Sequence, residues 1–369
     1  MDFVEWLGPD ASAIVFACLR DRADLARALA VSRSWRTFVM VVHLSKIQCL
    51  QLFPEVKFFA QIVKQPTTSA GSGNNVPMEE DAGSTCAAST AWENHKLEQE
   101  VYKRLAHALL SNYPDASCIA ACIGASTTDF FPDESIQNTL IAGDEVNDRP
   151  SYWSSRGHEN PGFPEFLLYK LSSDLCLIDE IRVQPFRATF QHGNPIYSVE
   201  CVRFKFGCPK SPLRPEDLVS DVSEGQLALL PDDSYIWTYT SPGFRMQQEN
   251  VLQSFKLPRP VLCIGGVVKV EFWGRVQKQE IDNLYYVCVS HVQVLGSPLT
   301  REWGVAPCDN GLILKYYPDH ESLGNSGSRE INWRDFEARL WRGVMLTGQG
   351  IGFNQDLLSR LLGPSCNLP

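Results

Sequence analysis

The sequence predicts an α+β multidomain chain, in which a helical N-terminal domain precedes an antiparallel β-sandwich. Apolar residues recur every three to four positions over residues 3–53, which is typical of amphipathic helices. Gly, Ser, Thr and Ala dominate residues 65–91, and this composition predicts a flexible linker. Apolar and polar residues alternate over residues 199–206 and 267–273, as they do in half-buried strands.

Residues 3–53 are predicted to form three short helices. Asp21 and Asp24 mark the turn between the first two helices, and Ser32 is placed to cap the third. The apolar stripes are Ile14, Val15, Cys18 and Leu19, then Leu25, Ala28, Leu29 and Val31, then Trp35, Phe38, Val39 and Val42. A domain of about 50 residues buries only a modest share of its surface. Another chain or the following domain must therefore cover part of these stripes.

The order and spacing of these residues resembles the F-box. In that family Leu-Pro and an acidic residue precede a helix that ends in Leu, and Asp-Leu and Val-Ser-x-x-Trp follow. The matching residues are Leu7, Asp10, Val15, Leu19, Asp24, Leu25, Val31, Ser32 and Trp35. Two departures are that Gly8 separates Leu7 from Pro9, and that Ala11 and Ser12 replace two residues that are commonly apolar.

The resemblance implies a three-helix F-box over residues 1–60 that binds a Skp1-type adaptor, and through it the cullin and RING subunits of an SCF ubiquitin ligase. Apolar side chains of the helices are then expected at the adaptor interface. The candidates are Leu7, Pro9, Val15, Leu19, Leu25, Val31 and Trp35. Some of them, above all Trp35, can instead hold the three helices together. A helical cap packed on its own chain is the alternative to the F-box.

A connecting helix is predicted over residues 92–112. Thr90 and Glu93 form a capping box, and Leu97, Val101, Leu105, Ala108 and Leu109 share one face of the helix. We expect that face to pack on the domain that follows. Residues 299–369 are predicted to be a C-terminal extension with short helices at 333–341 and 353–362.

The β-sandwich is predicted over residues 117–298. Further strands are expected at 166–171, 175–183, 235–239, 251–257 and 284–294. They follow one another without an intervening helical pattern, which favours an antiparallel sandwich over an α/β fold. The alternation breaks at Asp179, which predicts a β-bulge there.

The front half of this region is similar to a discoidin or galactose-binding-like jelly roll. The matching residues are Ala125, Ser126, Trp153, Ser154, Ser155, Leu168, Tyr169, Leu175, Ile178, Ile181 and Val183. An F-box followed by such a domain resembles a small group of plant F-box proteins. A jelly roll binds ligands with the loops at one end, so Tyr235, Trp237, Tyr239, Phe244 and Arg245 are candidate ligand-binding loop residues. Alternation equally allows Trp237 to point inward.

The composition of the chain limits the kinds of partner that it is expected to bind. The chain has 33 Lys and Arg against 43 Asp and Glu, and the net charge of −10 opposes binding to nucleic acid. No apolar run is long enough to span a membrane, and the acidic start does not resemble a signal peptide. Twelve cysteines are scattered without close pairing, which favours free thiols. We therefore expect a soluble protein of the cytoplasm, the nucleus or both.

No catalytic motif stands out in the sequence. There is no HExxH, GxSxG or Walker loop, and the seven histidines are isolated. Cys118 and Cys122 lack the second ligand pair of a zinc site, so neither a metal nor a cofactor is expected. The sequence predicts a non-catalytic substrate receptor for an unknown target. The rivals are a lectin-like glycan- or peptide-binding module, and a hydrolase with two acidic residues in a cleft.

Overall fold

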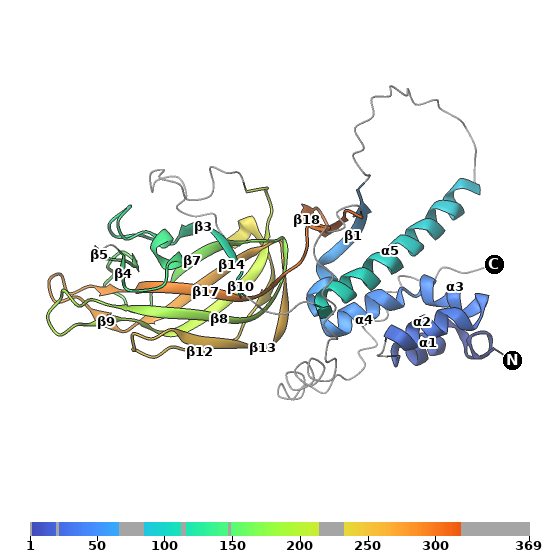
Figure 1. The fold of residues 1–369 in the computed structure, drawn as a ribbon, viewed down its shortest axis with the longest axis horizontal. Coiled ribbons are helices and arrows are strands. Elements are labelled where there is room, and N and C mark those ends of the chain that lie inside the picture. The colour runs from blue at the N-terminus through green and yellow to red at the C-terminus, as the bar shows by residue number, and fades with distance from the viewer. Residues whose placement is uncertain are drawn as a thin grey trace, which may run out of the picture. The chain divides into compact units, whose positions relative to one another are not determined.

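The structure is a computed structural model that describes residues 2–19, 22–65, 85–111, 116–146, 149–213 and 232–318. These residues form two compact units (Figure 1). The helical unit contains residues 2–56 and 85–111, and the β unit contains 57–65 and 116–318. Because both units are assembled from separate stretches, the described part of the chain passes from one unit to the other three times.

Five α-helices make up the described part of the helical unit. They are α1 (Phe3–Ala17), α2 (Arg22–Val31), α3 (Arg33–Val41), α4 (Leu44–Leu52) and α5 (Thr85–Ser111). The first three were predicted, and α4 is a fourth helix that the sequence analysis missed. His43 lies between α3 and α4 in the left-handed conformation, with φ 53° and ψ 45°. Only Val42 and His43 separate these two helices, whose apolar patterns run into each other.

Capping residues define two of the helix starts. Ser32 Oγ accepts a hydrogen bond of 3.1 Å from the Trp35 backbone N–H at the start of α3, which confirms the predicted cap. Asp2 Oδ1 accepts from the Val4 N–H at the start of α1. Within α1, Gly8 has φ 77° and ψ 170°, so the helix is kinked there and Pro9 begins its second part.

Helix α5 packs against α3 and α4 and belongs to the helical unit. Cys49 Sγ of α4 lies 3.3 Å from the Tyr102 carbonyl oxygen, and His43 Nδ1 lies 2.9 Å from Glu98 Oε2. The hydrogen bond from His43 lowers the pKa of Glu98. Two expectations are corrected here. The helix begins at Thr85, inside the predicted linker 65–91, and its packing face serves the preceding helices rather than the domain that follows.

The β unit is built from two six-stranded sheets in which every strand pair is antiparallel. The first sheet has the order β11-β10-β14-β7-β3, with β12 beside β10. Its strands are β3 (Ile119–Ala125), β7 (Glu165–Leu171), β10 (Val199–Pro209), β11 (Tyr235–Thr240), β12 (Phe244–Arg245) and β14 (Val267–Arg275).

The second sheet has the order β13-β8-β17-β2, with β6 beside β17 and β9 beside β8. Its strands are β2 (Ala116–Ser117), β6 (Trp153–Ser154), β8 (Leu175–Arg187), β9 (Ile196–Tyr197), β13 (Gln253–Ile264) and β17 (Cys288–Pro298). The two sheets enclose one apolar core that contains Trp153, Tyr169, Phe204, Phe206 and Phe272. The predicted antiparallel sandwich is confirmed.

Strand prediction from alternation was accurate, because each predicted strand overlaps an observed one. The predicted bulge is also present. On both neighbours of β8 the register passes from a partner of Ile178 directly to a partner of Glu180, so Asp179 is left unpaired.

A third, three-stranded sheet has the order β1-β19-β18. Its strands are β1 (Phe59–Lys64), β18 (Trp303–Cys308) and β19 (Gly311–Tyr316). Strand β1 runs parallel to β19, and Phe59 pairs with Leu312. This corrects two expectations, because Phe59 and Ala60 belong to a strand rather than to the F-box region 1–60, and the extension 299–369 begins with two strands. The helices expected at 333–341 and 353–362 lie outside the described residues.

Candidate functional site

Apolar side chains on the surface of the helical unit form the first candidate site. After Pro9, one side of α1 is buried through Ala13, Phe16 and Ala17, whereas Ile14 and Val15 on the other side are 45% and 44% exposed. Among the described side chains of the unit, the exposed large apolar residues are Trp6, Leu7, Ile14, Val15, Val31 and Val41. Trp6 is 75% exposed. The surplus of apolar surface expected from the sequence is therefore present.

The predicted adaptor residues divide into two groups. Leu7, Pro9, Val15 and Val31 are exposed, and they are available to a partner. Leu19 and Trp35 are half-buried and pack on the core of the helical unit. Leu25 lies in α2, and its side chain is outside the described part of the structure.

Trp35 connects α3 to the start of α1. Its indole N–H donates to Asp2 Oδ1 at 2.7 Å, and its ring meets that of Phe16 edge to face at a centroid distance of 5.0 Å. Ser32 Oγ donates to Asp2 Oδ2 at 3.4 Å. Of the two roles left open by the sequence, holding the helices together is the one that these contacts support for Trp35.

Three other exposed apolar residues of the helical unit were not among the candidates: Trp6, Ile14 and Val41. Ile14 was part of a predicted apolar stripe, and the stripe itself was the available signal. Nothing in the local pattern distinguished Trp6 and Val41 from core residues. Because aromatic side chains are enriched at interface hot spots, Trp6 is the strongest addition to the candidate interface.

The candidate ligand-binding residues of the sandwich lie on strands, so their placement in loops was wrong. Tyr235, Trp237 and Tyr239 are in β11, and Phe244 and Arg245 form β12. The Tyr239 ring stacks on Phe206 at a centroid distance of 5.4 Å, and Phe244 also packs on the main core. Tyr235 and Trp237 stack on each other at 5.0 Å in a separate cluster. Arg245 alone among the five is exposed. Pairing of β11 and β12 with β10 makes these aromatic residues part of a sheet.

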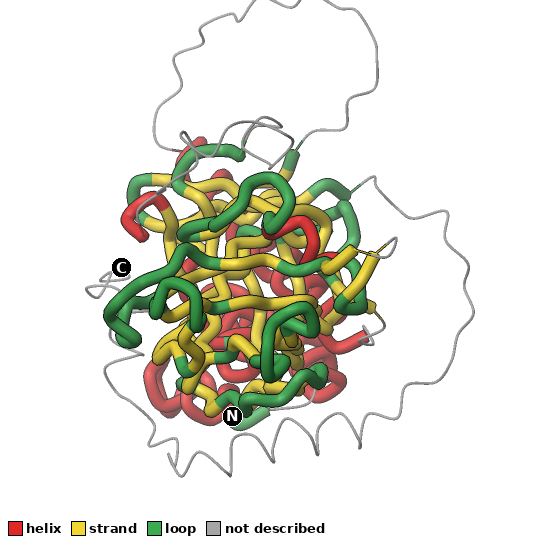
Figure 2. The backbone as a smooth tube through the Cα atoms, turned by 90° about the vertical axis from the view of Figure 1, so that its left-hand side faces the viewer, coloured by secondary structure: helices red, strands yellow, loops and turns green. Residues whose placement is uncertain are grey.

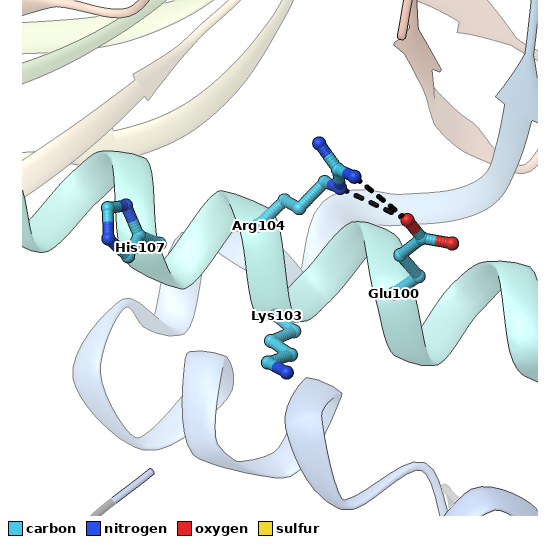
Figure 3. A pocket seen from close by; sticks show the side chains of 4 residues that line it. All are labelled: Glu100, Lys103, Arg104 and His107. Atoms are coloured by element: carbon cyan, nitrogen blue, oxygen red, sulfur yellow. Dashed lines mark hydrogen bonds and ion pairs between the residues drawn. The ribbon is translucent and has the colours of Figure 1, made fainter. Parts of the chain in front are cut away.

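A hollow of about 260 Å³ lies along α5 and is lined by Glu100, Lys103, Arg104 and His107 (Figure 3). Arg104 Nη2 lies 3.1 Å from Glu100 Oε1, and both side chains are more than half exposed. In Figure 3, Lys103 projects on a different side of the helix from Arg104. All four residues come from successive turns of one helix, so we assign no ligand to this hollow.

The Glu165 carboxylate is the side chain that most resembles a catalytic group. Burial raises its pKa, while hydrogen bonds from Ser126 and Thr127 and the charge of Arg275 oppose that rise. It forms an ion pair with Arg275, and both side chains are 1% exposed. A carboxylate so enclosed cannot reach a substrate, so its role is structural.

Within the described ranges, no three His, Cys, Asp or Glu side chains are grouped so as to hold a metal ion. None of the described helices is both long enough and apolar enough to cross a lipid bilayer.

The solved structures that are similar to this chain include two carbohydrate-binding modules. A family 32 module of Clostridium perfringens NanJ, in complex with galactose, is 7% identical with a TM-score of 0.29, over 47% of this chain and 98% of that chain. A family 32 module of Streptococcus pneumoniae EndoD is 10% identical with a TM-score of 0.32, over 49% and 98%.

No protein-family profile matches the chain. A curated F-box protein of Arabidopsis thaliana is 44% identical over 331 residues, which is 88% of this chain and 84% of the relative. A relationship this extensive covers the helical unit and the sandwich together. The F-box resemblance of the helices is thus confirmed, and this chain belongs to the F-box proteins.

Proposed function

We propose that the protein is the substrate-recognition subunit of an SCF-type ubiquitin ligase. The exposed apolar residues of the helical unit bind a Skp1-type adaptor, and through it cullin and RING subunits, while the sandwich binds the target protein. The observation that carries this proposal is the exposed apolar surface at Trp6, Ile14, Val15 and Val31 in a member of the F-box proteins. Such surfaces on soluble domains are typical of protein interfaces.

The receptor acts by proximity and supplies no catalytic group of its own. Holding a target lysine beside a ubiquitin-loaded enzyme raises the effective concentration of the two reactants. We place the protein in the cytoplasm, the nucleus or both, where such a ligase would meet soluble targets. A fluorescent fusion of the full chain, imaged in cells, tests that location.

The interface is tested by co-purification of the full chain with a Skp1-type adaptor. We expect Val15→Asp combined with Val31→Asp to abolish binding, because each substitution places a charge in an apolar contact. Both positions are exposed, so the helical unit should still fold. Leu19 is a poorer choice, since it packs on the core of the unit and a charge there would unfold it.

The matched control is Ile281→Asp, which makes the same chemical change at an 89% exposed site in the β unit. This variant should bind the adaptor as the unsubstituted protein does. Circular dichroism and thermal unfolding of all three proteins check folding. Full adaptor binding by the Val15 and Val31 variant would overturn the proposed interface.

A further inference from the structure

Five loops of the β unit gather at one end of the sandwich. Ala125 pairs with Leu167, Val199 with Arg275 and Val183 with Gln253, so these strands begin or end at the same end of the sandwich. The loops at this end are residues 126–135, 155–164, 188–195, 246–252 and 276–287. The last of them contains a short hairpin of β15 (Gln277–Lys278) and β16 (Tyr285–Tyr286). Figure 2 looks onto this end, where the loops lie in front of the strands. We call it the loop end.

Every one of the five loops carries an exposed large apolar side chain. These are Phe130, Phe163, Phe190, Val251 and Ile281, with exposed fractions of 67%, 42%, 57%, 50% and 89%. Single exposed apolar residues are common on protein surfaces. An exposed apolar residue on every loop at one end of a sandwich is a pattern that marks an interaction site.

Hydrogen bonds between neighbouring loops hold the loop end in one arrangement. Asn250 Nδ2 donates to Asp144 Oδ2 at 2.9 Å, which connects the 246–252 loop to the segment after Leu140. Gln248 Nε2 donates to Gln277 Oε1 at 3.2 Å and connects it to the 276–287 loop. A surface that is ordered before binding loses less conformational entropy when a partner arrives.

The buried Arg275 connects the 155–164 loop to the 276–287 loop. Its Nη1 donates to the carbonyl oxygens of Arg156 and Tyr285, both at 2.8 Å, and its Nε donates to that of Phe163 at 3.3 Å. Its ion-pair partner Glu165 accepts a hydrogen bond from Thr127 Oγ1 at 3.0 Å. The Arg275–Glu165 ion pair thus contacts three of the five loops, two through Arg275 and the 126–135 loop through Glu165.

The loop end is strongly acidic. The five loops contain seven Asp and Glu against two Lys and Arg, a formal charge of −5. Their exposed acids are Asp133, Glu159, Glu249, Glu280 and Asp282. This charge repels anionic lipids and phosphorylated segments and favours Lys and Arg.

We propose that the loop end captures an extended basic segment of a partner protein. Lys and Arg of the segment face the exposed carboxylates, and apolar residues between them contact the five loop-tip side chains. The inference rests on the proposed function only in naming that partner as the protein to be ubiquitinated.

The test measures binding of three labelled peptides to the full chain by fluorescence anisotropy. The peptides consist of five repeats of Lys-Phe-Ser, Glu-Phe-Ser or Lys-Ser-Ser. We expect the Lys-Phe-Ser peptide to bind, and to bind at least about tenfold more tightly than either of the others, because each of those lacks one of the two contacts. Added salt should weaken its binding, since the acids that attract it are exposed.

Two variants of the loop end check the location. The first replaces Phe130, Phe190 and Ile281 by Ser, and the second combines Glu249→Lys with Glu280→Lys. Both should weaken binding of the Lys-Phe-Ser peptide by about tenfold or more while adaptor binding is retained. Matched controls are Trp6, Ile14 and Val41 all replaced by Ser, and Glu93→Lys with Asp309→Lys, which should bind the peptide normally.

The outcomes separate the two proposals. If the Trp6, Ile14 and Val41 variant keeps the adaptor, the proposed function is weakened and the inference stands. If the Lys-Phe-Ser peptide fails to bind, binds no better than Glu-Phe-Ser, or binds the loop-end variants unchanged, the inference is overturned. Binding of phosphatidylserine vesicles or of galactose at the loop end, in place of the basic peptide, would also overturn it.

Discussion

His291 lies in β17 in the interior of the sandwich and has an incomplete set of hydrogen bonds. Its Nδ1 lies 2.8 Å from the Thr139 carbonyl oxygen, so this nitrogen carries the proton and donates it. Its Nε2 is buried without a hydrogen-bond partner among the described residues. Burial lowers the pKa of His291, although the hydrogen bond to Thr139 opposes the effect.

Acid should therefore destabilise the sandwich through His291. The pKa of His291 is lower in the folded protein than in the unfolded chain. Its contribution to the free energy of unfolding is therefore complete above about pH 6.5, and it is lost as the pH falls through the pKa of the folded protein. His291→Asn keeps an N–H donor and does not titrate. We expect the free energy of unfolding, measured with urea, to fall less between pH 7.5 and pH 5.5 for this variant than for the unsubstituted protein. An equal difference would contradict the assignment.

The Glu165–Arg275 ion pair is the second residue-scale prediction. Glu165→Leu alone should cost about 3–5 kcal/mol, because it leaves Arg275 buried and unpaired. Adding Arg275→Met removes that charge together with the three hydrogen bonds to loop carbonyl oxygens, so the double variant should lose less than the sum of the two single losses. The free energies of unfolding come from urea titrations of both single variants and the double variant. Strictly additive losses would show that the pair is not coupled.

At this scale the sequence predicted features that depend on near neighbours. The Ser32 cap and the Asp179 bulge both follow from local patterns. The indole hydrogen bond from Trp35 to Asp2 spans 33 residues, and the pair Glu165 and Arg275 spans 110. Because no local signal joins residues so far apart, neither contact was predictable from one sequence.

At the scale of elements, the kink in α1 sets the direction of its exposed residues. Gly8 has φ 77° and ψ 170°, a conformation that is essentially restricted to glycine. A Cβ there would meet no atom within 4 Å, so a side chain would strain the backbone without a clash.

Gly8→Ala should therefore cost about 1–3 kcal/mol and turn Trp6 and Leu7 away from their present direction. We expect weaker binding to a Skp1-type adaptor, measured by calorimetry, and lower thermal stability of the helical unit. Peptide binding at the loop end should not change. Unaltered adaptor affinity and stability in the Gly8→Ala variant would contradict a role for the kink.

The prediction of helices and strands succeeded where a periodic apolar pattern continues over many residues. It failed where the pattern is short or runs from one element into the next. The alternation that predicted β10 and β14 runs over residues 199–206 and 267–273. By contrast, α3 and α4 merge into one pattern that only the left-handed His43 interrupts. The aromatic residues of β11 were misplaced because alternation predicts a strand but does not reveal that β10 pairs with it.

At the scale of the whole molecule, the three passages between the units bear on truncation. Removal of residues 1–56 leaves β1 intact, whereas removal of residues 1–65 deletes it. The second truncation leaves β19 without its parallel partner and uncovers the fully buried Leu312 and Leu314. Both truncations remove α1 to α4 and uncover α5 equally.

We expect the chain that begins at Lys57 to be more stable than the chain that begins at Pro66, by several kcal/mol. Each lost backbone hydrogen bond is worth about 1 kcal/mol, and the exposed leucines add to the loss. Thermal and urea unfolding of the two truncated chains give the comparison. Equal stability would show that β1 is dispensable.

The organisation into a helical part and a sandwich was predictable because each has its own hydrophobic period. The third sheet was not, since its strands are short and β1 pairs with residues far along the chain. That α5 belongs to the helical unit was likewise not predictable, because the apolar face of a helix does not indicate which surface it packs against.

The pairing of β1 with β19 also governs the order of events during synthesis. The ribosome releases residues 59–64 about 250 positions before their partner strand emerges, an interval of roughly ten to fifty seconds at ordinary elongation rates. During this interval, the backbone N–H and C=O groups of residues 59–64 are unpaired and can form hydrogen bonds with strands of other chains. A chaperone that shields this segment until translation has passed Tyr316 would therefore raise the yield of folded protein.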